Sequence, residues 1–246
     1  MSPRSLLRGA VLLLLFAAGA ARAAEIVTVP NELEWAAWPE FCRARFVVSA
    51  AGRNSAMKRR VPPSQTQLWE SRLGDWWYAL HHHCAGLLLQ SRGRLEPNAK
   101  QRQYLFRTAI REFQYSLDRT TRGTYGFSES VTQQGNTFRL LGDDVSALEA
   151  YDLSIATNPT YAPAYAAKAL YYRDAGKSDE ALEVLLAGDK AVGGQSAEIH
   201  YFLGMTYFER GEYEKAREHA RGAYSRGYNL PALRNKLASA GFALDP

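Results

Sequence analysis

The sequence lacks most of the short motifs that mark a known chemistry. Its 246 residues contain no C-x-x-C pair, no C-x-x-C-H haem attachment, no phosphate-binding loop and no nucleophile elbow. There is also no pair of carboxylates placed for acid–base work and no third group to orient a cysteine–histidine pair. We therefore expect no catalytic residues and no cofactor, and the sequence does not indicate an enzyme.

Charge of one sign and long apolar runs are also scarce. The formal net charge is +5 at pH 7, and removal of residues 1–23, which hold three arginines and no acid, lowers it to +2. This balance is too small to indicate a nucleic-acid partner. No segment after residue 23 is long and apolar enough for a membrane helix, so we expect no stable membrane insertion.

The first 23 residues read as a signal peptide. Arg4 and Arg8 precede the apolar run of residues 11–18, and Ala21-Arg22-Ala23 fits a small-x-small cleavage site. The run is too short to span a bilayer, and therefore a removed leader cut after Ala23 is the better interpretation. The predicted address is export, most simply to a bacterial periplasm.

The second half of the chain repeats at intervals of roughly 34 residues. Units begin near Ser128, Ala162 and Ala197. In each unit small, aromatic, glycine and alanine positions follow one another in the same order. The positions are Gly135, Phe138, Gly142, Ala147 and Tyr151; Ala169, Tyr172, Gly176, Ala181 and Leu185; and Gly204, Tyr207, Gly211, Ala216 and Ala223.

These residues resemble the tetratricopeptide-repeat family. The resemblance implies an all-α fold, a right-handed superhelical solenoid of helix hairpins. It also implies that the first helix of each unit ends at a glycine, namely Gly142, Gly176 or Gly211. Leu230, Leu233 and Leu237 share one helical face after the last unit. They predict a C-terminal capping helix over Pro231–Ala240, so residues 128–246 form three repeat units and a cap.

The front of the chain is less regular. Residues 24–64 contain glycine, two prolines and a basic run, and we expect an irregular segment that includes Cys42. Residues 65–127 resemble a degenerate hairpin with helices over Trp76–Gln90 and Tyr104–Leu117. The loop between them, Ser91–Lys100, is longer than the repeat pattern allows.

Two cysteines and three consecutive histidines stand out in this front part. An even cysteine count in an exported chain predicts a Cys42–Cys84 disulfide, which would stabilise the fold by about 4 kcal/mol. Consecutive helical residues point about 100° apart, so His81, His82 and His83 cannot converge on one ion with Cys84. We interpret His82 as a core residue, His83 as facing the groove and His81 as a surface residue, with no metal site. A metal- or redox-handling protein that uses the two cysteines and one histidine is the alternative.

The resemblance also implies a binding groove. In this family the first helices line a concave face, and the matching positions run from polar and basic to aromatic. Such a face suits an extended or helical peptide with an acidic end and an apolar end, although the protein's own chain could fill it instead. The predicted lining consists of Thr132, Asn136, Arg139, Ala166, Leu170, Arg173, Tyr201, Met205 and Phe208.

Taken together, the sequence predicts an exported scaffold that binds a protein or peptide. The arrangement of Phe41-Cys42 with His-His-His-Cys-Ala-Gly also looks like exported proteobacterial repeat proteins without an assigned role. By analogy, cell-envelope or secretion-system assembly is the expected setting.

Overall fold

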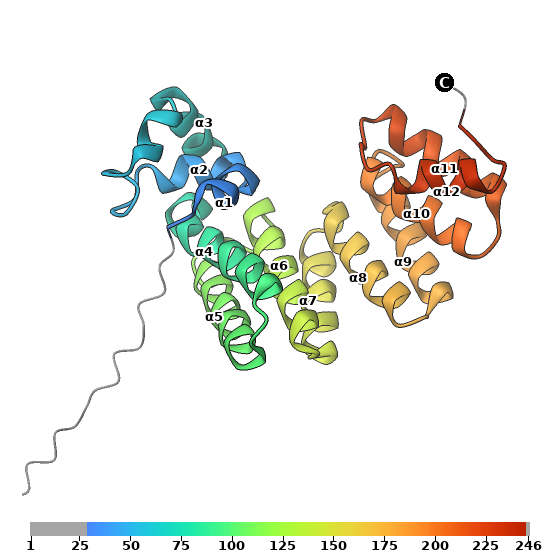
Figure 1. The fold of residues 1–246 in the computed structure, drawn as a ribbon, viewed down its shortest axis with the longest axis horizontal. Helices are drawn as coiled ribbons and strands as arrows, with labels where there is room; N and C mark the ends of the chain where they lie inside the picture. The colour runs from blue at the N-terminus through green and yellow to red at the C-terminus, as the bar shows by residue number, and fades with distance from the viewer. Residues whose placement is uncertain (1–28, 245–246) are drawn as a thin grey trace, which may run out of the picture.

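The computed structural model describes residues 29–244, and this range folds into helices without a strand (Figure 1). The signal peptide predicted for residues 1–23 lies outside the described residues. Eight of the helices form four successive pairs. The pairs are α4 (Trp76–Leu95) with α5 (Ala99–Leu117), α6 (Tyr125–Leu141) with α7 (Asp144–Thr157), α8 (Ala162–Asp174) with α9 (Ser178–Ala191), and α10 (Ala197–Glu209) with α11 (Tyr213–Ser225).

The pairs stack in chain order to form an arched solenoid, seen from green to red in Figure 1. The first helices α4, α6, α8 and α10 contact one another in series, and each also packs against its own second helix. The helix α12 (Ala232–Ser239) covers α10 and α11 and buries Leu233 and Leu237. The structure thereby confirms the predicted all-α solenoid and its C-terminal capping helix.

Small residues set how closely the helices of a pair approach. A Cβ atom added to Gly135 of α6 would lie 2.7 Å from the Tyr151 ring of α7, so only glycine fits there. Gly142 ends α6 with φ 77°, a left-handed conformation that glycine adopts without strain. The Asp143 N–H then donates to the Phe138 carbonyl at 3.0 Å and closes the helix end. The repeat glycines thus have the packing and capping roles that the sequence predicts.

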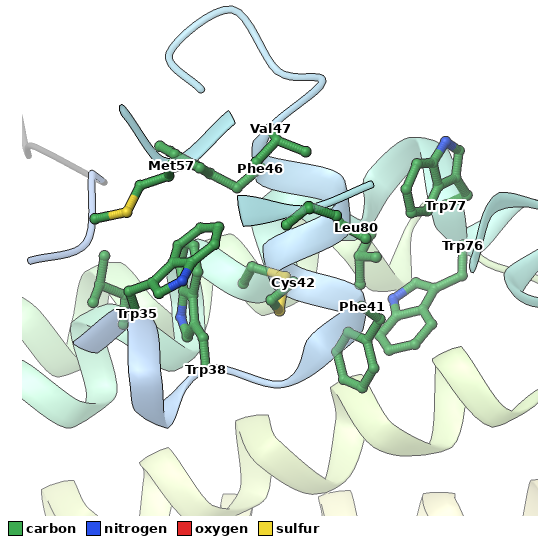
Figure 2. Packing of buried hydrophobic residues seen from close by; sticks show 14 residues of the cluster. Trp35, Trp38, Phe41, Cys42, Phe46, Val47, Met57, Trp76, Trp77 and Leu80 are labelled. Carbon is green, nitrogen blue, oxygen red and sulfur yellow. A yellow bond between two sulfur atoms is a disulfide. The ribbon is translucent and has the colours of Figure 1, made fainter. Parts of the chain in front are cut away.

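An aromatic core closes the N-terminal face of the solenoid. The short helices α1 (Glu32–Ala37) and α2 (Glu40–Phe46), the 3₁₀ helix η1 (Ala56–Arg60) and the helix α3 (Pro63–Leu73) form a cap. The buried cap residues Trp35, Trp38, Phe41 and Phe46 gather around Cys42 of α2. They pack against Trp76 and Trp77 of α4, as Figure 2 shows. We call this unit, residues 29–73, the N-terminal cap. The tryptophan-rich segment therefore covers the solenoid's first face, and Trp69 alone of the five tryptophans is only partly buried.

One boundary prediction for the front half, the long loop over residues 91–100, was wrong. Helix α4 continues to Leu95 and α5 begins at Ala99, so the long loop predicted for residues 91–100 is three residues long. Gly93 does not end α4, because a Cβ there would lie 2.4 Å from the Phe106 ring, and the glycine serves close packing on α5. The expected domain limits after residues 64 and 127 fall inside α3 and α6. Pro63 starts α3 rather than a loop, since proline fits the first helical turn.

Candidate functional site

The first helices of the three predicted units, α6, α8 and α10, carry the candidate binding residues. We call the surface that these helices share the inner face. Five of the predicted lining residues on these helices are half-buried: Asn136, Arg139, Leu170, Arg173 and Phe208. Leu170 lies outside the hydrophobic clusters of the described residues, whereas Phe208 packs against one of them. The Leu170 side chain therefore contributes little to the core.

Four predicted lining residues, Thr132, Ala166, Tyr201 and Met205, are buried. The Thr132 hydroxyl donates to the Ser154 hydroxyl of α7 at 3.1 Å, inside its own helix pair. The Tyr201 ring packs on Tyr228, with centroids 4.6 Å apart, because the chain after α11 folds back over it. These positions serve helix packing in the described chain, and their role as groove lining stays a prediction.

The two arginines of the inner face are paired within the protein. Arg139 of α6 contacts Asp174 at the end of α8 at 2.8 Å. One repeat further on, Arg173 binds both carboxylate oxygens of Glu209 at 2.5 and 3.0 Å. Each guanidinium therefore joins one repeat to the next, and we call these two pairs the arginine ladder. The basic end predicted for the groove is neutralised, so it does not suit an acidic peptide end.

Two carboxylates also belong to this face. Glu129 of α6 and Glu198 of α10 occupy the second place of their units and are half-buried. Glu129 accepts hydrogen bonds from the Tyr161 hydroxyl and from Gln133 Nε2, the latter at 3.2 Å. Burial raises the pKa of Glu198, and the charge of Glu129 raises it further. Among the described residues neither carboxylate has a lysine or arginine partner.

The inner face is thus acidic and aromatic at its centre. Burial also raises the pKa of Glu129 itself. The Tyr161 ring beside it meets the Tyr125 ring edge to face, with centroids 5.8 Å apart. A half-desolvated carboxylate among aromatic rings favours a cationic donor over water or an anion. In the sequence, the signal for these two carboxylates is that Glu129 and Glu198 both occupy the second place of their repeat units.

A buried polar chain adjoins Glu129. His83 Nδ1 lies 3.0 Å from the Ser130 hydroxyl, and His83 Nε2 lies 3.8 Å from a Glu129 oxygen. The order serine, histidine, carboxylate resembles a hydrolytic triad, but Ser130 and His83 are both 0% exposed, so no substrate reaches the hydroxyl. Burial lowers the pKa of His83 to about 3, which keeps the ring neutral. The arrangement is a core network.

The histidine run has a different arrangement from the one we expected. His83 is the core residue, while His82 is half-buried and binds Glu112 of α5 through Nδ1 at 2.6 Å. His81 is exposed, as expected. The reason lies in helix phase, because the α4 side chains at positions 76, 83 and 90 face α5 and α6.

The cysteines of α2 and α4 lie at bonding distance. Their Cα atoms are 5.6 Å apart, as a disulfide between Cys42 and Cys84 requires. Within residues 29–244 no three His, Cys, Asp or Glu side chains converge as a metal site would need. No helix in the described range is long and apolar enough to cross a bilayer.

Comparison with known proteins gives one family match. The tetratricopeptide-repeat model matches residues 197–226, which comprise α10 and α11. No curated protein matches the chain.

Solved structures that match the chain include three with low scores. The MamA structure is 19% identical with a TM-score of 0.41, over 59% of this chain and 88% of that chain. TTC0263, a thermophilic TPR protein from Thermus thermophilus, is 24% identical with a TM-score of 0.41, over 69% and 95% of the two chains. YrrB, described as a TPR protein with an unusual peptide-binding site, is 17% identical with a TM-score of 0.41, over 73% and 98%. Because these TM-scores are low, the identification of tetratricopeptide repeats rests on the stacked helix pairs and on the family match to residues 197–226.

Proposed function

We propose that this tetratricopeptide-repeat protein is an exported scaffold that binds a partner polypeptide along its inner face. Repeat solenoids offer extended surfaces of this kind, and their function lies in what those surfaces hold. The observation that supports the proposal most directly is the composition of the inner face. It combines the half-buried side chains of Leu170 and Phe208 with the half-buried carboxylates of Glu129 and Glu198.

The partner segment should carry apolar side chains and at least one lysine or arginine. Because the arginine ladder ties up both guanidinium groups, the face offers a peptide no unpaired cation from Arg139 or Arg173. Glu198 forms no ion pair within residues 29–244 and accepts a charge-assisted hydrogen bond from a cation at little further desolvation cost. Apolar anchors between such groups are typical of sites that carry most of the binding energy.

The proposed location is the bacterial periplasm, in cell-envelope or secretion-system assembly. The leader predicted for residues 1–23 supports export. The bonding geometry of Cys42 and Cys84 agrees with an oxidising compartment. The setting within the envelope rests on analogy with other exported repeat proteins.

The test is a cross-linked pull-down of the tagged protein from the cell envelope, run with two matched variants. Leu170→Asp places a charge on the inner face. Leu186→Asp places the same charge on α9, where the leucine is already 44% exposed. Both variants should keep the native thermal unfolding curve. We expect one partner to be captured by the native protein and by Leu186→Asp and to be lost with Leu170→Asp.

A second variant addresses the chemistry of the partner. Glu198→Gln removes the carboxylate charge with almost no change of shape, so it should weaken binding of the captured partner by about tenfold. If Leu170→Asp and Leu186→Asp capture the same partners equally, the inner face is not the binding surface. If Glu198→Gln has no effect while Leu170→Asp abolishes capture, the face is right but the cationic recognition is wrong.

A further inference from the structure

A cavity lies at the junction of the N-terminal cap and the first helix pair, apart from the inner face. Its volume is about 310 Å³. The side chains of Trp38 and Phe46 form one wall, and the Cys42–Cys84 pair forms the floor. The cavity is lined by helices α2, α4 and α5 and by the loop after α2. Its size is at the lower end of the range for small-molecule sites, and it holds a ring-sized group.

The ionisable groups of the cavity, His81, His82 and Glu112, come from α4 and α5. Glu112 of α5 is 27% exposed and binds His82 Nδ1 through one oxygen at 2.6 Å, and within the described chain its second oxygen accepts no hydrogen bond. His81 Nδ1 lies 3.4 Å from an Arg45 nitrogen. The His81 ring also donates a hydrogen bond to the Tyr78 backbone. Partial burial of the ring lowers the pKa of His81 to about 4, and the nearby His82 and Arg45 lower it as well, so the ring is neutral.

This distribution of groups selects a ligand class. The wall is apolar and aromatic, so it favours a hydrocarbon ring or a branched chain. The lining holds one carboxylate oxygen that lacks a donor, and no lysine or arginine lines the cavity. An ammonium group satisfies that oxygen, a neutral hydroxyl does so more weakly, and a carboxylate is repelled.

We propose that this cavity binds a small primary amine with an apolar body of ring size. The body lies against Trp38, Phe46 and the cysteine pair, and the ammonium donates to Glu112. The proposal gives His81, His82 and the Cys42–Cys84 pair a shared role, and it does not depend on the inner face.

The experiment titrates three matched probes, phenethylamine, phenethyl alcohol and phenylacetate, into the purified chain with its cysteines oxidised. The readout is the indole N–H resonance of Trp38, identified by its loss in Trp38→Phe. We expect phenethylamine to bind at least about tenfold more tightly than phenylacetate, with the alcohol between them. Equal affinity for the three probes, or no shift of the Trp38 resonance with any of them, overturns the proposal.

Three variants locate the site. Glu112→Gln should lower the affinity for phenethylamine by about tenfold and leave that for the alcohol unchanged. The control Glu183→Gln, on the exposed surface of α9, should change neither affinity. Ala51→Trp fills the mouth of the cavity from an exposed loop position and should abolish binding of all probes. Unchanged binding in either Glu112→Gln or a folded Ala51→Trp shows that the amine binds elsewhere and contradicts the proposal.

Discussion

His83 should make the free energy of unfolding depend on pH. The ring is 0% exposed, with Nδ1 3.0 Å from the Ser130 hydroxyl, and its Nε2 has no hydrogen-bond partner. Burial lowers its pKa to about 3 in the folded chain, whereas a histidine in an unfolded chain titrates near 6.5. Between these values the unfolded state binds one more proton than the folded state. The stability contributed by neutral His83 is therefore fully present above about pH 6.5 and is lost as the pH falls.

The size of the effect follows from proton linkage. Lowering the pH from 7 to 5 protonates most unfolded chains at this histidine and almost no folded ones, which costs about 2 kcal/mol of unfolding free energy. The figure barely changes if the folded pKa is one unit higher, because both values lie well below pH 5. Glu129 acts in the opposite direction, since burial raises its pKa and the folded state then takes up the extra proton. A comparison with a variant that changes His83 alone removes that contribution.

The assay is urea unfolding followed by circular dichroism at pH 7 and pH 5, for the native chain and for His83→Asn. We expect the variant to be less stable at both values because its smaller side chain leaves a void. The native chain should nevertheless lose about 2 kcal/mol more than the variant between the two pH values. The same pH-dependent loss in both proteins would refute the reasoning, because it would mean that His83 titrates freely in the folded state.

Two further outcomes test the cysteine pair and the repeat packing. Replacing Cys42 and Cys84 together by serine should lower the unfolding free energy by about 4 kcal/mol. Thiol titration of the native sequence, unfolded without reductant, should find no free thiol. Two free thiols in protein recovered from the envelope would contradict the pairing. Gly126→Ala should lower the unfolding free energy by about 1–3 kcal/mol, measured by urea unfolding, because its Cβ would lie 2.3 Å from the buried Trp76 ring. A neutral or stabilising result would show that the ring can move aside.

The repeat half of the fold could be predicted from the sequence because its determinants are local. Gly135 and Gly142 act within one helix pair, through close approach to Tyr151 and through a left-handed helix end. The same two roles recur one repeat later, so a single sequence contains several copies of the same signal. The capping helix was equally visible, because Leu233 and Leu237 repeat at helical spacing.

The front half and the binding face depend on contacts between distant residues. Gly93 reads as a helix end in isolation, and only the Phe106 ring of α5 explains why the helix continues. Arg139 and Arg173 fit the ligand positions of a groove, yet their partners lie 35 and 36 residues further along the chain. Both separations are within about two residues of the repeat period, so a search for opposite charges about one period apart would have found both pairs.

The two ends of the solenoid are closed by very different means. The N-terminal cap buries an aromatic core against α4 and is tied to it at Cys42 and Cys84, while α12 closes the other end with eight residues. In a solenoid each repeat contacts only its neighbours, and local opening proceeds from the less anchored end. We therefore expect hydrogen exchange to be fastest in α11 and α12 and to slow toward α4. A partner seated on α10 would occupy the region that opens first, so its residence time would be set by fraying of the last repeat as well as by its own contacts.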